Sequence, residues 1–133
     1  MQTYYLAIDI GASSGRHILG HLENGSLKLE EIYRFENGMQ KQGKKLLWDT
    51  EHLFTEIVNG MKRCSELGKI PHSMSIDTWA VDYVLLDEND EVLGDTYGYR
   101  DHRTNDMDEE VYKLVPEKEL YSKTGIQKQI FNT

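Results

Sequence analysis

A stretch of small residues, Asp9–Arg16, separates two apolar, β-prone runs near the N-terminus, and this pattern constrains the fold more than any other feature. The runs cover residues 4–8 and 17–22, so the sequence predicts two strands joined by a short, flexible loop. An Asn-Gly pair at residues 24–25 predicts a type I′ turn into a third strand that ends near residue 35. The beginning of the chain is therefore expected to form an antiparallel three-stranded meander.

The loop between the first two strands carries residues suited to phosphate. Its glycines permit positive φ angles, and its amides and hydroxyls are potential donors to phosphate oxygens. Asp9 is placed at a strand end to hold Mg²⁺ directly or through water, and Arg16 can neutralise charge on a phosphoryl group. A glycine-rich turn with a solvated Asp and Arg explains the same eight residues equally well. The residues that would contact phosphate are Gly11, Ala12, Ser13, Ser14, Gly15 and Arg16.

Composition narrows the classes of partner. The 133 residues are one domain's length, and 15 Lys and Arg against 23 Asp and Glu give a formal charge of -8. This acidity opposes general attraction to nucleic acid or to an anionic membrane. No basic N-terminal region precedes a long apolar run, and the lone cysteine, Cys64, rules out an internal disulfide framework. We therefore expect a cytoplasmic protein that binds neither nucleic acid nor membrane.

The clearest helix signal covers Thr50–Leu67, where apolar residues recur at spacings of one, three and four. Asp49 or Thr50 can cap its first turn, and Gly68 provides a left-handed stop. Cys64 lies on the apolar stripe, which favours a core position over a catalytic thiol. The preceding residues 37–45, with two glycines and three lysines, are expected to form an exposed loop.

The second half of the chain alternates apolar runs and turns. We expect a strand over residues 73–78, then a hairpin of two strands around an acidic turn, two short helices, and the start of a further element. These segments are, in order, residues 79–86 and 91–99 for the hairpin, 107–114 and 116–122 for the helices, and 126–133 for the last element.

Two clusters in this half combine aromatic and charged side chains. In the first, Trp79 offers an apolar face and Asp82 a carboxylate, a pair suited to the C–H face and hydroxyls of a sugar. The alternative is a hairpin with an outward Trp and Asp. In the second, Arg100 and Arg103 bracket Asp101, and an ion-pair knot that braces the sheet edge is the favoured interpretation.

Taken together, these segments resemble the FGGY carbohydrate kinase family, and within it the N-terminal part of the rhamnulokinase branch. The resemblance covers essentially the whole chain but only the first quarter to third of such a kinase. It rests on Asp-x-Gly-Ala-Ser-Ser-Gly-Arg at residues 9–16, Trp48-Asp49 before the helix, Ile-Asp-Thr-Trp-Ala-Val-Asp-Tyr at residues 76–83, Tyr-Arg-Asp-His-Arg-Thr at residues 99–104, and the closing residues 122–127 and 131–133.

The resemblance implies an α/β fold of the ribonuclease-H-like type shared by the actin and hexokinase superfamily. Residues 1–133 would be the first part of the kinase's N-terminal domain, with the antiparallel meander leading into a mixed sheet and the C-terminal domain absent. The intact protein would use ATP and Mg²⁺ to phosphorylate a small ketose, L-rhamnulose, at its terminal hydroxyl. Asp9 and Arg16 would serve catalysis, with Asp9 also at the metal, and the sugar would contact Trp79, Ala80, Asp82, Tyr99, Arg100 and Asp101.

Two departures from the family pattern leave alternatives open. Ala80 stands where rhamnulokinases typically have Gly, so a fuculokinase or another deoxy-ketose or pentulose kinase is the alternative. No position matches the family's general-base aspartate, so the missing C-terminal part is expected to supply it and this chain alone is expected to be inactive. An alternative of another class is a non-catalytic regulator that binds sugar or nucleotide on the same fold.

Overall fold

The computed structural model describes residues 2–132, which form two compact units. The first unit contains the described chain up to Met39 and the segment Asp49–Ala80. The second contains Gln40–Trp48 and the described chain from Val81 onwards. The predicted site residues are therefore divided between two bodies, each with its own internal structure.

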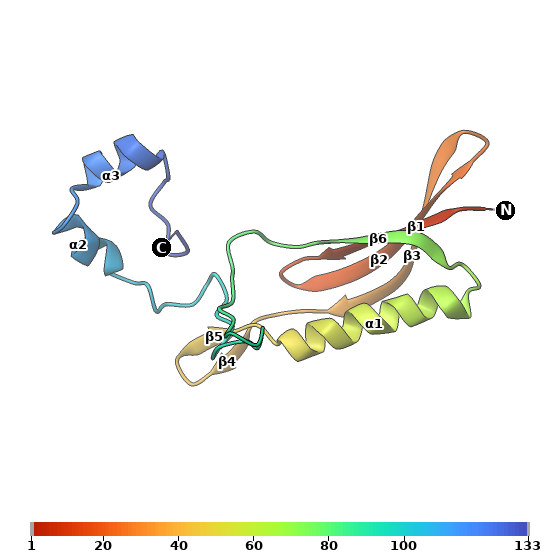
Figure 1. Cartoon of the computed structure of the whole chain (residues 1–133), viewed down its shortest axis with the longest axis horizontal. Helices are drawn as coiled ribbons and strands as arrows, with labels where there is room; N and C mark the ends of the chain where they lie inside the picture. The colour runs from red at the N-terminus through yellow and green to blue at the C-terminus, as the bar shows by residue number, and fades with distance from the viewer. Residues whose placement is uncertain (1, 133) are drawn as a thin grey trace. The chain divides into compact units, whose positions relative to one another are not determined.

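A four-stranded mixed sheet is the frame of the first unit (Figure 1). The strand order is β3-β2-β1-β6, with β2 antiparallel to both β3 and β1, and β6 parallel to β1. This arrangement confirms the predicted meander leading into a mixed sheet. The strands are β1 (Tyr4–Ile10), β2 (Ser14–Glu23), β3 (Ser26–Glu36) and β6 (Pro71–Asp77).

The β2–β3 hairpin follows the predicted turn chemistry. Asn24 and Gly25 both have positive φ angles, 51° and 78°, as a type I′ turn requires. His17 pairs with Tyr33 whereas Ile18 pairs with Glu31, so one extra residue bulges from β3 between these pairs. The bulge lies beside the doubled glutamate, and β3 is an edge strand.

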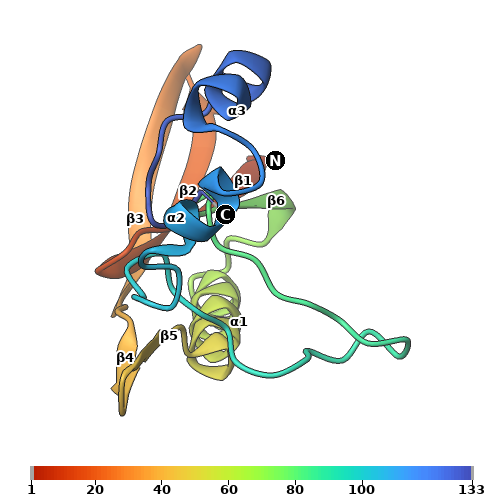
Figure 2. The ribbon, with the colours of Figure 1, turned by 90° about the vertical axis from the view of Figure 1, so that its left-hand side faces the viewer.

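Helix α1 (Thr50–Glu66) covers one face of this sheet (Figures 1 and 2). Alternate residues of β1, namely Leu6, Ile8 and Ile10, are buried on that face with Leu19, Phe35 and Cys64. Full burial of a large aliphatic side chain contributes about 1.5–3 kcal/mol, so packing rather than intrinsic propensity holds the helix. The Asp49 carboxylate caps the helix by accepting from the amide of His52 at 2.9 Å, and Gly68 has a φ of 67°, as predicted.

The imidazole of His17 is fully buried between β2 and α1. Its Nε2 lies 3.1 Å from the carbonyl oxygen of Ile57, so this nitrogen carries the proton, and the buried Nδ1 has no partner among the described residues. Burial lowers the pKa of His17 from its usual value of 6.5, outweighing the opposing effects of the Ile57 carbonyl and the Glu56 charge. His17 is therefore neutral in the folded state at physiological pH.

We expect acidification to weaken the first unit through His17. Below about pH 6.5, His17 is protonated in the unfolded chain but remains neutral in the folded chain, because its folded pKa is lower. The contribution of His17 to the free energy of unfolding is therefore complete above that pH and is lost as the pH decreases through the folded pKa. Amide exchange of β2 and α1 peptides, corrected for intrinsic rates, should show less protection at about pH 5.5 than at about pH 7.5. His17→Gln should remove much of this difference, whereas His72→Gln, at an exposed site, should leave it in place. Equal pH dependence with and without His17 would assign the effect to other groups.

The second unit begins with a short hairpin where the sequence predicted an exposed loop. Strands β4 (Gln40–Gln42) and β5 (Lys45–Leu47) pair across a turn in which Gly43 has a φ of 63°. The prediction for residues 37–45 was wrong, because the lysines are solvated on a paired ribbon and do not prevent pairing.

The predicted hairpin over residues 79–99 was also wrong. Its acidic turn is present, with the Asp87 amide donating to the Glu91 carbonyl at 2.9 Å. Next to this turn, the Leu93 amide donates to the Leu85 carbonyl at 2.7 Å and an isolated bridge joins Leu86 to Val92, but no regular ladder follows in the described residues. The two apolar runs form a long irregular loop rather than strands (Figure 2). Side chains such as Leu85, 62% exposed, pack against too little to hold a regular ladder.

Two short helices close the described chain, near the predicted positions. They are α2 (Met107–Tyr112) and α3 (Glu117–Thr124), and Gly125 ends the second with a φ of 66°. Residues 126–132 form no further helix or strand, which corrects the expected last element; the end of that prediction, residue 133, lies outside the described residues. Within residues 2–132, none of the helices is long and apolar enough to cross a membrane.

Candidate functional site

The loop between β1 and β2 is shorter than the sequence suggested. β1 continues to Ile10 and β2 begins at Ser14, so only Gly11–Ser13 lie outside the strands. Asp9 and Arg16 are consequently strand residues that face each other across the antiparallel pair. Their side chains share one face of the sheet, immediately beside the loop.

Neither Gly11 nor Gly15 has a positive φ, so the expectation that glycine is needed here for a positive φ was wrong. A Cβ on Gly15 would lie 2.1 Å from the ring of Phe35, and one on Gly11 would lie 3.1 Å from the carbonyl oxygen of Ser14. The glycines are required because other groups approach their Cα atoms closely. The Phe35 contact joins residues twenty positions apart, so local sequence gave no signal for it.

Asp9 and Arg16 form a two-donor ion pair through one carboxylate oxygen. Arg16 donates from Nε at 2.9 Å and from Nη2 at 2.7 Å, both to Oδ2 of Asp9. The side chains are 43% and 46% exposed, and Oδ1 of Asp9 has no partner within residues 2–132. Asp77 pairs with Asp9 in the β1–β6 register, so the two carboxylates stand on neighbouring parallel strands. Asp9 thus retains a free, solvent-facing oxygen whose orientation is fixed by arginine.

Asn37, the residue after β3, braces the Gly11–Ser13 loop, which leaves two amides open. Asn37 donates from its backbone to the Ser13 carbonyl at 3.0 Å and from its side chain to the Gly11 carbonyl at 2.8 Å. The amides of Ala12 and Ser13, both exposed, meet no acceptor in the described part of the chain. Sequence reasoning missed Asn37, since nothing near it in the sequence points to a loop 26 residues earlier.

Trp79 and Ala80 end the first unit. Trp79 is partly buried and packs against the hydrophobic core of that unit, whereas Ala80 is exposed. Neither expected packing alternative for Trp79, a sugar platform or an outward side chain, included this contact with the core.

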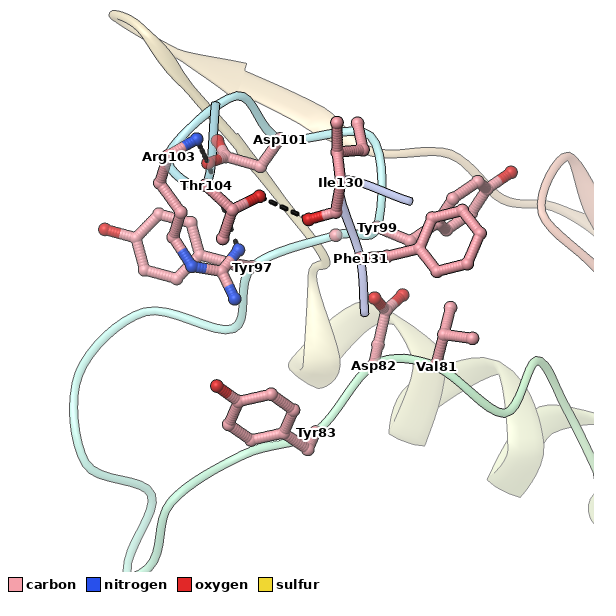
Figure 3. Close-up of a pocket in the computed structure, with 11 residues that line it drawn as sticks. Val81, Asp82, Tyr83, Tyr97, Tyr99, Asp101, Arg103, Thr104, Ile130 and Phe131 are labelled. Atoms are coloured by element: carbon pink, nitrogen blue, oxygen red, sulfur yellow. Dashed lines mark hydrogen bonds and ion pairs between the residues drawn. The ribbon is translucent and has the colours of Figure 1, made fainter. Parts of the chain in front are cut away.

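The second unit contains an aromatic-rich pocket that includes three of the predicted sugar-binding residues, Asp82, Tyr99 and Asp101 (Figure 3). Arg100 is outside the lining and places its guanidinium 5.2 Å from the centre of the Tyr99 ring. The sequence analysis did not assign the remaining lining residues to a site, although residues 97, 130 and 131 bring two more aromatic rings and an aliphatic side chain. The lining consists of Val81, Asp82, Tyr83, Tyr97, Gly98, Tyr99, Asp101, Arg103, Thr104, Ile130 and Phe131.

Asp101 lines this pocket and fixes the backbone of two segments beside it. It is 4% exposed and accepts from the amides of Leu46 and Arg103, both at 2.8 Å. Burial would raise the pKa of Asp101, but these two hydrogen bonds and the charge of Arg103 outweigh it and lower the pKa below its usual value. The Arg103 guanidinium stacks 4.4 Å above the centre of the Tyr97 ring and lies 3.9 Å from Asp101. Asp101 is thus held mainly by backbone amides, with Arg103 at the limit of an ion pair and Arg100 placed over the Tyr99 ring instead. The favoured interpretation, a knot of two arginines around Asp101 at a sheet edge, was therefore wrong for Arg100 and for the sheet edge.

Comparison of the sequence with known protein families gives a match over almost the whole chain. Residues 4–133 match the profile of the FGGY family of carbohydrate kinases, N-terminal domain. The chain belongs to the FGGY family of carbohydrate kinases.

Curated relatives are named rhamnulokinases. The sequence is 51% identical over 133 residues to the rhamnulokinase of Oceanobacillus iheyensis, covering 100% of this chain and 28% of that protein. It is 52% identical over 130 residues to that of Halalkalibacterium halodurans, covering 98% and 28%, and 45% identical over 129 residues to that of Bacillus subtilis, covering 97% and 27%. The chain therefore spans little more than a quarter of the length of these relatives.

Solved structures support the α/β kinase fold. A gluconate kinase from Lactobacillus acidophilus aligns with a TM-score of 0.73 at 16% identity, covering 95% of this chain and 25% of that one. A glycerol kinase from Plasmodium falciparum, solved with ADP, aligns with a TM-score of 0.73 at 14% identity, covering 98% and 27%. At these identities the likeness concerns the fold alone, and it confirms the predicted fold class.

Proposed function

We propose that this chain is the N-terminal part of an ATP-dependent kinase that phosphorylates L-rhamnulose at its terminal hydroxyl. The observation that carries this proposal is the sequence identity between this chain and rhamnulokinases, which is 51% over 133 residues and 52% over 130 residues in two of them. In the full-length protein, this chain would continue to the length of those relatives. Residues 1–133 would form the first part of its N-terminal domain.

The β1–β2 loop is the proposed phosphate side of the site. The exposed amides of Ala12 and Ser13 are donors for phosphate oxygens, and the hydroxyls of Ser13 and Ser14 add further donors. The free Oδ1 of Asp9 suits a hydrated Mg²⁺, which, when bound, withdraws charge from phosphoryl oxygens. Arg16 keeps its Nη1 group available to a transferring phosphoryl group while its other donors orient Asp9.

The pocket of the second unit is the proposed ketose side. Asp82 offers a carboxylate to sugar hydroxyls, and the rings of Tyr97, Tyr99 and Phe131 offer apolar faces to the carbon skeleton. Trp79 and Ala80 precede this segment in the sequence, and the family resemblance implies that they also contact the sugar. Arg100 and Asp101 are proposed to shape the site, Arg100 through Tyr99 and Asp101 through the backbone.

The proton of the sugar hydroxyl must be taken by a base outside this chain. As the new P–O bond forms and ADP leaves, that hydroxyl loses its proton, and family resemblance assigns this step to an aspartate with no counterpart here. We therefore expect no turnover from residues 1–133 alone. The remaining part of the same kinase is the proposed partner.

A sugar panel tests the proposal. In a coupled assay of ADP release, the full-length protein should turn over L-rhamnulose with a kcat/KM at least about tenfold above those for fuculose, xylulose and glycerol. A preference for fuculose or xylulose would instead identify the alternative kinase that Ala80 leaves open. Absence of turnover with every ketose and polyol would contradict the kinase proposal and favour a non-catalytic binding protein.

A further inference from the structure

Trp48 holds one of the pocket residues by a single side-chain hydrogen bond. Its indole Nε1–H donates to Oδ2 of Asp82 at 2.6 Å, and Trp48 is only 5% exposed. A partly buried, charge-assisted bond of this length is among the stronger hydrogen bonds in a protein. Asp82 therefore keeps Oδ1 for another donor, while Oδ2 is already occupied by the indole.

Regular backbone structure does not fix Asp82 in place. The segment around it, residues 81–84, belongs to no strand or helix, and the first bridge in this region occurs only at Leu86. The side chain of an Asp in such a loop samples several rotamers unless a partner selects one. In this structure the indole of Trp48 is that partner, and Figure 3 shows the carboxylate directed toward the side of the pocket with Tyr99 and Phe131.

The segment of residues 46–48 also fixes the backbone around Tyr97, another residue that lines the pocket. Trp48 donates its backbone N–H to the Thr96 carbonyl at 2.8 Å, and the Leu46 carbonyl accepts from the Gly98 amide at 2.9 Å. These bonds fix the backbone on either side of Tyr97, whose ring lines the pocket. Residues 46–48 thus fix the backbone around Tyr97 through main-chain hydrogen bonds and fix the Asp82 carboxylate through the Trp48 side chain.

We propose that Trp48 is a positioning residue for ketose binding, which sets Asp82 so that its free oxygen accepts a hydroxyl of the sugar. This inference rests on the proposed kinase function and deepens it. Trp48 need not touch the sugar, since its effect passes through Asp82. Loss of the indole N–H should therefore weaken ketose binding while leaving the ATP side of the reaction intact.

A double-mutant cycle in the full-length protein tests the inference. Trp48→Phe should raise KM for the ketose about tenfold or more, with kcat and KM for ATP within about threefold of wild type. In an Asp82→Ala background the same change should have less than about a threefold effect, because the acceptor of the indole hydrogen bond is already lost. Trp48→His, which keeps a ring N–H donor, should recover part of the ketose affinity lost in Trp48→Phe.

The outcomes separate this inference from the proposed function. Equal effects of Trp48→Phe with and without Asp82→Ala, or equal changes in both KM values, would show that Trp48 acts by packing alone and would overturn the inference. If Trp48→Phe does not fold, Trp48→His and Asp82→Ala decide, since unchanged ketose KM in both also overturns it. If wild type prefers another ketose and the cycle holds with that sugar, the L-rhamnulose proposal fails and the role of Trp48 stands. Wild type that binds no ketose, measured by calorimetry without ATP, would overturn both.

Discussion

Asp9→Asn in the full-length protein is expected to lower kcat by about 10²–10³, while KM for the ketose changes by less than about threefold. The substitution keeps the shape of the side chain but removes the charge that orients Arg16 through two hydrogen bonds and that would hold Mg²⁺. Both losses act on the phosphoryl group during transfer rather than on sugar binding. Steady-state kinetics with each substrate varied in turn would measure the separation.

Glu31→Gln is a matched control for this prediction. Glu31 is also an exposed carboxylate paired with an arginine of the same sheet, since Arg34 lies 2.6 Å from it. Exposed pairs of this kind contribute about 0–1 kcal/mol to stability, so Glu31→Gln should leave kcat within about twofold of wild type. If Asp9→Asn behaved like Glu31→Gln, the Asp9–Arg16 stretch would be a plain hairpin turn after all.

The first unit was predictable because its signals are local. The Asn-Gly pair fixed the β2–β3 turn, and the apolar stripe with Asp49 and Gly68 fixed the limits of α1. Strand β6 was predicted from a segment after the helix in which polar and apolar residues alternate. In each case the residues that determine the element are the residues within it.

The features that escaped prediction depend on contacts between distant segments. The ring of Phe35 leaves room only for glycine at position 15, and Asn37 braces the Gly11–Ser13 loop. Neither contact can be predicted from residues 9–16 alone, because Phe35 and Asn37 lie outside that stretch. In the second unit, β5 bonds to the backbone around Tyr97 rather than to a continuous hairpin strand. An apolar run predicts a strand only if a neighbouring backbone is available to pair with it.

The candidate site shows the same division. The sequence identified Asp9, Arg16, Asp82 and Tyr99 by residue type and by resemblance to a family. It did not reveal Trp48 as the partner of Asp82, because 34 positions separate them. Side chains that touch a ligand can be proposed from motifs, whereas side chains that orient them require the fold.

Gly60→Ala is expected to destabilise the first unit, although alanine is the better helix former by about 1 kcal/mol. A Cβ at Gly60 would lie 2.3 Å from the ring of His17, which is fully buried and hydrogen-bonded to Ile57 and so cannot move aside freely. Overpacking of this kind costs about 1–3 kcal/mol, so amide protection in α1 and β2 of the full-length protein should fall about tenfold to a hundredfold.

Two companion variants identify the cause of that loss. Ser65→Ala, at an exposed position of the same helix, should leave protection unchanged or slightly raised, because it alters propensity without a clash. In a His17→Ala background, Gly60→Ala should cost much less, since the ring that obstructs the new methyl group is gone. A Gly60→Ala chain as well protected as wild type would mean that α1 and β2 pack less closely than the 2.3 Å approach requires, and the buried state of His17 would then have to be reconsidered.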